Sequence, residues 1–331
     1  MESCGLQLRL FGEGERLANM LISVVIPTLN REEPLCDTLQ YFLRSETYRP
    51  FELIVIDQSE EHDTATTEFL ASVALRMTYV KVAYKSLPKA RNHGVRLSRG
   101  DIVVFVDDDV EPASGFLAAH AAPYANLRVA GVTGPTLAPG QALLGRAELG
   151  EKVLAVLTSR TAMRFDVNFS FSATWAAGCN MSFRKEVIER LGGFDENFFG
   201  VAIGEDVEFS HRVRAAGGLI RYSPEARLVH KNVPTGGCRT AANARRYIEA
   251  FVANTVYYNR RVRATRWERC GNLWYVFRKL VCNSSVIKEG QFVRRGVHFI
   301  GALATSRRRL KGLRTPSLSA PAVTQAAGEL G

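Results

Sequence analysis

Residues 101–110 read Asp-Ile-Val-Val-Phe-Val-Asp-Asp-Asp-Val, an apolar run that leads directly into three carboxylates. Five consecutive apolar residues, most of them β-branched, are typical of a strand that is buried on both faces of a parallel sheet. In open α/β sheets the ligand crevice lies beyond the carboxyl ends of the strands. The stretch therefore predicts a central strand that carries Asp107, Asp108 and Asp109 to a ligand-binding edge.

Three adjacent carboxylates raise one another's pKa and repel one another unless a cation lies among them. Mg²⁺ and Mn²⁺ prefer oxygen ligands and often bridge one or two carboxylates to the phosphates of a ligand. An Asp-rich turn or a helix cap is the plainer interpretation of such a cluster. From these residues alone, a metal site and a structural turn are both open.

The segments around this strand alternate between strand and helix patterns. We expect strands at residues 21–27, 51–57 and 77–83, and helices at residues 34–45, 64–74 and 89–97. The second of these strands is apolar and ends in a carboxylate, Asp57. Such alternation implies right-handed crossovers and a mainly parallel, Rossmann-like sheet of the nucleotide-binding class.

The chain divides into four expected parts, which are an extension (1–19), an α/β domain (20–237), a basic helical segment (238–315) and a tail (316–331). The tail consists of small residues without a core-forming pattern, so we expect it to be disordered.

The charge of the chain is unevenly placed. The 331 residues are 46% hydrophobic and 23% charged, as in an ordinary soluble globular protein. Residues 238–315 contain 18 Lys or Arg and 3 Asp or Glu, whereas residues 1–237 contain 25 and 29. A near-neutral domain is therefore followed by a strongly basic segment.

Cysteine usage and hydropathy bear on the compartment. The six cysteines show neither a CxxC motif nor zinc-ligand spacing, and the first 20 residues lack the apolar core of a secretory signal peptide. No apolar run reaches the ~18 residues of a spanning helix. We therefore expect a cytoplasmic protein with free thiols.

Six short motifs occur in a fixed order. They are Val-Val-Ile-Pro-Thr-Leu-Asn (24–30), Leu-Pro-Lys-Ala-Arg-Asn-His-Gly (87–94), Val-Asp-Asp-Asp (106–109), Ala-Gly-Cys-Asn-Met-Ser-Phe-Arg (177–184), Gly-Gly-Phe-Asp-Glu (192–196) and Gly-Glu-Asp-Val-Glu (204–208). Each motif alone is weak, but their order across residues 20–237 resembles that of the GT-A-type glycosyltransferases of family 2.

The resemblance implies inverting transfer of a sugar from a nucleoside diphosphate donor, with Mg²⁺ or Mn²⁺ neutralising the leaving diphosphate. Asp107 and Asp109 match the Asp-x-Asp motif of the family. Asp109 is then the direct metal ligand, and Asp107 or Asp108 faces the ribose or the donor sugar. His230 lies where many members place a late metal or diphosphate ligand, and a surface histidine at a strand end is the alternative.

The resemblance also implies a catalytic base. Glu205 and Asp206 match a Glu-Asp pair of the family, in which Asp206 would take the acceptor proton. A carboxylate suits this role if the pocket raises its pKa toward the working pH. The alternative is that both residues are first-turn acids that complement the helix dipole.

The donor nucleotide is implied to lie against two loops. Thr28 and Asn30 follow the first strand and Asp57 follows the second, where the family holds the base and ribose. Lys89 and Arg91 are candidates for contact with the diphosphate.

Two stretches bear on specificity. Gln58 stands where the family commonly has a second aspartate, which puts a uracil preference in doubt and leaves dTDP- and GDP-sugars open. Trp175, Gly178 and Asn180 are expected to border the donor sugar and the acceptor, although a tryptophan there could equally belong to the core.

The basic segment shows apolar stripes at helical spacing, interleaved with aromatic residues and arginines. Such helices fit an anionic membrane surface, and the alternative is that the stripes pack on the α/β domain. No nucleic-acid reader motif is recognisable, so we expect no nucleic-acid partner. We expect a peripheral protein on the cytoplasmic face of the plasma (inner) membrane.

The leading hypothesis is a metal-dependent, inverting glycosyltransferase that acts on a glycan or polyprenyl-linked acceptor in cell-surface polysaccharide synthesis. A sugar nucleotidyltransferase is one alternative, and the lack of a Gly-rich phosphate loop after the first strand argues against it. A non-catalytic basic membrane- or nucleic-acid-binding protein is another, and it would have no use for the acidic cluster or the Glu-Asp pair.

Overall fold

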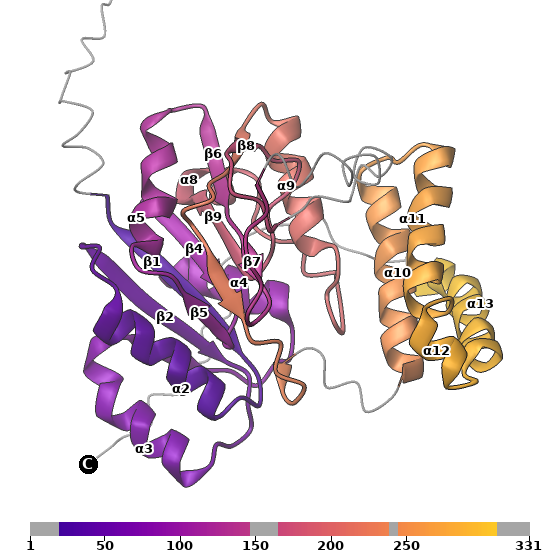
Figure 1. Ribbon diagram of the computed structural model, residues 1–331, viewed down its shortest axis with the longest axis horizontal. Helices are drawn as coiled ribbons and strands as arrows, with labels where there is room; N and C mark the ends of the chain where they lie inside the picture. The colour runs from indigo at the N-terminus through magenta and orange to yellow at the C-terminus, as the bar shows by residue number, and fades with distance from the viewer. Residues whose placement is uncertain (1–19, 146–164, 238–243, 310–331) are drawn as a thin grey trace, which may run out of the picture.

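The computed structural model describes residues 20–145, 165–237 and 244–309, in which an α/β domain is followed by a group of helices (Figure 1). The expected extension (1–19) and tail (316–331) lie outside the described residues.

The central sheet has eight strands in the order β3-β2-β1-β4-β9-β6-β10-β8. These strands are β1 (Ile22–Thr28), β2 (Phe51–Asp57), β3 (Thr78–Lys81), β4 (Ile102–Val106), β6 (Val129–Thr133), β8 (Phe171–Ser172), β9 (Asn180–Arg184) and β10 (Leu219–Tyr222). Only β9 and β8 run antiparallel to their neighbours. The predicted mainly parallel α/β sheet is thus confirmed, with β4 at its centre and every residue of β4 buried.

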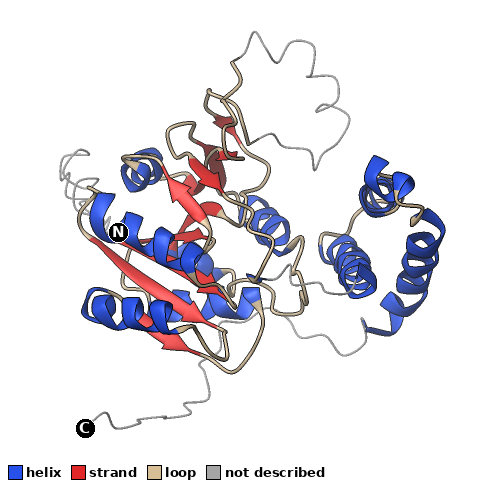
Figure 2. Ribbon diagram, turned by 60° about the horizontal axis from the view of Figure 1, so that its bottom comes forward, coloured by secondary structure: helices blue, strands red, loops and turns tan. Residues whose placement is uncertain are grey.

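Helices cover both faces of this sheet (Figure 2). They are α2 (Glu33–Gln40), α3 (Thr64–Val73), α4 (Leu87–Leu97), α5 (Phe116–Ala121), α8 (Lys185–Arg190) and α9 (Glu205–Ala215). Ile22, Val24 and Ile26 of β1 join the core on one face, and Val25 joins the core on the other. This alternation follows from the two-residue period of a strand.

The fit of α4 against β1 places part of the site. A Cβ atom on Gly94 would lie 2.3 Å from Val25 Cγ1, so only glycine allows this approach of helix to sheet. The close packing brings Arg91, on the same helix, to the carboxyl edge of the sheet.

A small second sheet lies beside the carboxyl end of β4. It contains β5 (Val110–Pro112), β11 (Leu228–His230) and β7 (Thr136–Leu137) in the order β5-β11-β7. His230 pairs with Val110 across the antiparallel β5–β11 ladder. The pairing joins the carboxylate loop to a segment that lies more than 100 residues further along the chain.

The C-terminal helices are α10 (Ala244–Arg261), α11 (Arg266–Leu280), α12 (Ser284–Lys288) and α13 (Phe292–Arg309). Buried residues of α10, α11 and α13 form a separate hydrophobic core. Polar contacts help to attach α10 to the α/β domain. Tyr257 Oη donates to Asp195 at 2.6 Å, and Asn254 Nδ2 donates to the Phe199 carbonyl at 2.9 Å. Arg261 pairs with both Glu208 and Asp195 at 3.1 Å. Within the described residues, no helix is both long and apolar enough to span a bilayer.

Candidate active site

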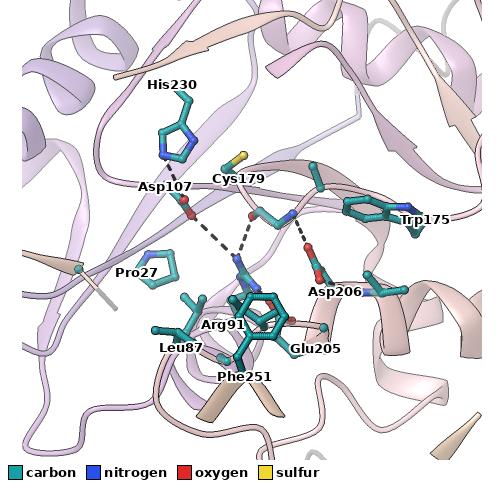
Figure 3. Close-up of a pocket in the computed structure, with 18 of the residues that line it drawn as sticks. Pro27, Leu87, Arg91, Asp107, Trp175, Cys179, Glu205, Asp206, His230 and Phe251 are labelled. Atoms are coloured by element: carbon teal, nitrogen blue, oxygen red, sulfur yellow. Dashed lines mark hydrogen bonds and ion pairs between the residues drawn. The ribbon is translucent and has the colours of Figure 1, made fainter. Parts of the chain in front are cut away.

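A cavity of about 950 Å³ lies at the carboxyl ends of β1 and β4, between the α/β domain and the helices α10 and α11. Predicted site residues that line it are Thr28, Gln58, Arg91, Asp107, Asp108, Asp109, Trp175, Gly178, Glu205, Asp206 and His230. Figure 3 shows part of this lining, with Arg91 between Asp107 and Glu205.

The three consecutive aspartates have different surroundings. Asp108 is 5% exposed and accepts a hydrogen bond from Thr28 Oγ1 at 2.7 Å. Asp109 is 1% exposed; its Oδ2 accepts from the Val233 amide at 2.9 Å, and its Oδ1 lies 2.9 Å from His230 Nε2. The Asp107 side chain is 33% exposed, and it is therefore the most open of the three to the cavity.

Arg31 holds the two buried aspartates together. Its Nε lies 3.3 Å from Asp108 Oδ1 and its Nη2 lies 3.3 Å from Asp109 Oδ2. Sequence reasoning missed this residue, although it directly follows Asn30 in the first-strand loop. No local sequence pattern predicts that Arg31 contacts Asp108 and Asp109, which lie more than 70 residues further along the chain.

Burial and neighbouring charges shift the titration of this cluster. Burial, with the charges of Asp107 and Asp109, raises the pKa of Asp108 to about 7, although Thr28 and Arg31 oppose the shift. Burial also acts on Asp109, but hydrogen bonds from His230 and the Val233 amide hold its pKa below the usual value. Burial acts to lower the pKa of His230, but the hydrogen bonds to Asp109 and Cys179 and the nearby charge of Asp107 together outweigh it and raise the pKa to about 11.

Donor atoms of Asp107, Cys179 and His230 lie within 4.8 Å of one another, so these residues fit a divalent ion. His230 Nε2 is 3.6 Å from Asp107 Oδ2. Both Asp109 oxygens already have partners, and the partner of Oδ1 is the same His230 Nε2 that faces Asp107, so direct ligation by Asp109 stays a prediction. Cys179 was missed because it stands alone in its motif, without a second cysteine at zinc-ligand spacing.

Arg91 is buried at the centre of the acidic lining. It forms an ion pair with Glu205, donates to the Gly178 carbonyl at 2.9 Å and lies 4.0 Å from Asp107. Burial raises the pKa of Glu205 against the opposing charge of Arg91, and Asp206 adds to the rise. Because Glu205 forms this ion pair, we assign it to positioning Arg91.

Asp206 is the acidic residue of α9 that meets the cavity without an arginine partner at contact distance. Gly204, at φ +94°, precedes the helix, and the Asp206 oxygens accept from the amides of Gly178 at 3.0 Å and Val207 at 2.8 Å. Burial raises the pKa of Asp206, whereas Arg91 lowers it. The arrangement suits a carboxylate that accepts a proton from an acceptor hydroxyl.

Three residues expected at the nucleotide do not line the cavity. Asp57 accepts from the Ser59 amide at 2.8 Å and from His62 and Tyr79. The Asn30 amide donates to Ser59, and the ammonium of Lys89 lies over the Tyr84 ring at 4.1 Å. Contact of Asp57, Asn30 or Lys89 with a nucleotide stays a prediction that the lining does not support.

Gln58 and Thr28 do line the cavity. The Gln58 side chain spans two loops, since its Nε2 donates to the Thr28 carbonyl at 3.3 Å and its Oε1 accepts from the Ser86 amide at 2.6 Å. Reading of a base edge by Gln58 would therefore require this bridge to open.

Asn180 has a supporting place instead of the expected one at the sugar. Its side chain is fully buried; Nδ2 donates to the carbonyls of Pro135 and Ala226, both at 2.9 Å, and Oδ1 pairs with His120 Nε2 at 3.0 Å. Trp175, by contrast, lines the cavity beside Asp206 (Figure 3).

The far wall of the cavity comes from the basic segment. Its lining residues are Tyr247, Phe251, Thr255, Tyr258, Asn272, Tyr275, Val276 and Lys279. The apolar stripes predict either a membrane-binding face or packing on the α/β domain. They do not predict that these residues line the site, because that depends on how α10 packs against the α/β domain.

Comparison with known proteins assigns the family. The sequence profile of Glycosyl transferase family 2 matches residues 23–192. Validoxylamine A glucosyltransferase of Streptomyces hygroscopicus subsp. limoneus is 31% identical over 233 residues, which cover 62% of this chain and 50% of that protein. Chondroitin synthase of Pasteurella multocida (strain Pm70) is 25% identical over 244 residues, covering 65% of this chain and 25% of that protein.

Among solved structures, the mannosyltransferase PcManGT from Pyrobaculum calidifontis, in complex with GDP-Man and Mn²⁺, is similar with a TM-score of 0.55, 20% identity and 86% coverage of both chains. S. aureus TarS 1–349 gives a TM-score of 0.52 at 15% identity, covering 88% of each chain. These structures share the GT-A fold. The chain spans about half the length of the first curated relative, and it belongs to glycosyl transferase family 2.

Proposed function

We propose that the protein is an inverting, divalent-metal-dependent glycosyltransferase. One observation carries the proposal: Gly178 lies between the candidate metal ligand Asp107 and a separate carboxylate, Asp206, that faces the cavity. Its amide donates to Asp206 and its carbonyl accepts from Arg91, which lies 4.0 Å from Asp107. A single displacement needs such a pair, with charge neutralised at the leaving group and a base at the acceptor.

In the proposed reaction, the acceptor oxygen bonds to the anomeric carbon of the donor as the bond to the diphosphate breaks. Asp206 takes the proton of the acceptor hydroxyl, and Arg91 offers positive charge on the side of Asp107. A bound divalent ion would supply Lewis-acid stabilisation of the diphosphate, held by Asp107 and His230. Glu205 keeps Arg91 in place.

The donor class is supported by relatives in fold. One of these structures holds GDP-Man with Mn²⁺, and TarS has been seen with UDP-GlcNAc. We therefore propose a nucleoside diphosphate sugar as the donor and leave its base to experiment, since Gln58 is engaged between two loops.

For the acceptor we propose a glycan or polyprenyl-linked hydroxyl. The wall of Tyr247, Phe251, Tyr258 and Tyr275 offers apolar ring surfaces against which a sugar ring or an isoprenoid could pack. The names of the relatives include a glucosyltransferase and a synthase of the polysaccharide chondroitin, which supports a role in polysaccharide synthesis.

We also propose that the protein binds the cytoplasmic face of the plasma (inner) membrane peripherally. Val293, Val297 and Ile300 of α13 follow the i, i+4, i+7 spacing of one helical face and are 73%, 63% and 67% exposed. Residues 244–309 contain 15 Lys or Arg and 3 Asp or Glu, a net charge of +12. An exposed apolar stripe on a basic helical group favours an anionic lipid surface.

The catalytic proposal is tested by incubating the protein with UDP-, GDP- or dTDP-sugars, a metal ion and a panel of acceptors. We expect release of nucleoside diphosphate with one donor and a product of inverted anomeric configuration by NMR. Retention of configuration would contradict the inverting mechanism. Pyrophosphate release from a sugar phosphate and a nucleoside triphosphate would instead identify a nucleotidyltransferase.

A further inference from the structure

The thiol of Cys179 lies in the cavity beside the proposed metal ligands (Figure 3). Within the part of the chain that the structure describes, Asp107, Cys179 and His230 form the one set of three such donors close enough to share an ion. The Sγ atom lies 3.7 Å from Thr136 Oγ1, at the limit of a weak hydrogen bond.

The position of this thiol is fixed by its backbone. Residues 177–180 form a turn in which the Asn180 amide donates to the Ala177 carbonyl at 2.8 Å. Thr133 Oγ1 closes the turn from behind by donating to the Asn180 carbonyl at 2.7 Å. Cys179 is therefore held at the tip of a braced turn.

The same brace holds the strand that carries His230. Asn180 Nδ2 donates to the carbonyl of Ala226, two residues before β11 begins. Asn180 is fully buried, and His120 fixes its amide orientation. The separation of Cys179 from His230 thus does not depend on a flexible loop, and a metal ion would meet both side chains already placed.

The chemistry of this donor set differs from that of an all-oxygen site. Mg²⁺ demands six hard, mostly oxygen ligands, whereas thiolate and imidazole suit Zn²⁺ and Co²⁺. Three protein ligands drawn from cysteine, histidine and carboxylate, with one open position, are the pattern of catalytic zinc sites. Ligands at ~2.0–2.3 Å from one ion lie about 3.3–3.8 Å apart. The 3.6 Å between His230 and Asp107 is already in that range.

We infer that Cys179 ligates the metal ion together with Asp107 and His230, and that the site consequently selects Zn²⁺ or Co²⁺ over Mg²⁺. The inference rests on the metal site of the proposed function and goes beyond it in naming the third ligand and the ion class. Thr136, which contacts the free thiol, would lose that contact when the ion binds.

The test is a Co²⁺ titration of the metal-free full chain, followed by absorption. We expect an intense thiolate-to-cobalt charge-transfer band in the near ultraviolet that saturates at one equivalent. Cys179→Ser should abolish the band and weaken Zn²⁺ binding by more than about 10-fold, since even outer-shell changes cost that much. Cys36→Ser is the matched control; its thiol contacts Thr66 outside the cavity, and the band should persist.

A second measurement uses the wild-type protein, so its result does not depend on whether Cys179→Ser folds. Zn²⁺ should protect Cys179 from iodoacetamide in peptide mass spectrometry, while the exposed Cys270 reacts at the same rate with and without the ion. Absence of both the band and the protection would overturn the inference. Donor turnover with Mn²⁺ in Cys179→Ser would then still support a glycosyltransferase, so the two proposals fail separately.

Discussion

At the scale of single residues, neighbouring acids of one motif have different roles because their partners differ. Glu205 and Asp206 are adjacent, yet only Glu205 pairs with Arg91. Asp206 is held by two backbone amides, which fix its orientation without neutralising its charge. A carboxylate held in this way can accept a proton from an acceptor that enters the cavity.

Asp206→Asn keeps the shape of the site and removes the base. We expect donor affinity to stay within a few-fold, while the rate of transfer falls by ~10²–10⁴, the share that general-base catalysis supplies. Isothermal titration and a nucleoside diphosphate release assay separate the two quantities. Glu186→Gln, an exposed first-turn acid of α8, is the matched control and should change neither. Near-full transfer by Asp206→Asn would favour the helix-dipole role.

A pH dependence of stability follows from Asp108. Its pKa of about 7 lies above its ordinary value, so between pH ~4 and ~7 the folded state binds more protons than the unfolded state. The contribution of Asp108 to the free energy of unfolding of the metal-free protein should therefore fall as pH rises through this window, whereas that of His120, whose pKa burial lowers to about 4, should rise. His230 continues the trend above its ordinary pKa, because its folded-state pKa of about 11 is also raised.

Urea unfolding in EDTA at several pH values measures this trend. Between pH ~4 and ~7, stability should fall less, or rise more, with pH in Asp108→Asn than in the wild type, because the titrating group is gone while an oxygen remains for Thr28. Asp101→Asn, at the exposed opposite end of the same strand, should keep the wild-type slope. A slope in Asp108→Asn equal to that of the wild type would contradict the role assigned to Asp108.

At the scale of elements, the three-residue strand β11 does much to assemble the site. It runs antiparallel to β5 and parallel to β7, and so places His230 beside the loop after β4. Asn180 connects the Cys179 turn to β7 and to the start of this small sheet through the Pro135 and Ala226 carbonyls. The position of the metal ligands therefore depends on a buried amide that does not touch the cavity.

Asn180→Ala should test this dependence. The change removes the partner of the Ala226 carbonyl and of His120 Nε2, whereas the Pro135 carbonyl keeps the Leu228 amide. At ~1–3 kcal/mol for each of these two unsatisfied groups, we expect a loss of a few kcal/mol of stability. Metal affinity should fall as well, because the Cys179 turn and β11 lose their common anchor. Asn168→Ala, at an exposed position, should stay within ~0.5 kcal/mol of wild type in urea unfolding. Unchanged metal affinity in a folded Asn180→Ala protein would contradict the positioning role.

The sequence predicted elements better than contacts between distant elements. Hydrophobic runs marked β1, β2 and β4, and strand ends located Asp107–Asp109, because local period and composition determine both. Arg31 and Cys179 could not be found in this way, since their roles arise where the loop after β1, the turn before β9 and β11 converge. Asp57 shows the converse: it ends a strand as expected, yet its oxygens are occupied by Ser59, His62 and Tyr79.

At the scale of the whole molecule, the basic helical group has two separate surfaces. One face of α10 and α11, with Phe251 and Val276, contributes to the cavity wall. Val293, Val297 and Ile300 on α13 are instead exposed. Some apolar residues of the basic helical group thus pack toward the α/β domain, and others stay exposed, as a membrane-binding face would require. Both interpretations of the apolar stripes are therefore compatible with the structure.

If the exposed stripe of α13 lies on lipid, the protein should sediment with anionic liposomes and be released as salt rises. Attraction between exposed charges is screened as the Debye length falls from ~10 Å at 0.1 M to ~3 Å at 1 M salt. Shallow apolar insertion is not screened in this way, so binding that persists at 1 M salt measures its share.

The double variant Val297→Glu, Ile300→Glu should lower liposome binding, including the part that survives high salt, because it places two carboxylates on the inserting face. Leu75→Glu, Leu127→Glu is the matched control, since both leucines are exposed apolar residues of the α/β domain. Turnover of a short soluble acceptor should be the same in all three proteins, because neither pair lines the cavity. Equal sedimentation with neutral and anionic liposomes at every salt concentration would refute the electrostatic part of the proposal. Equal binding by both double variants would show that α13 is not the inserting face.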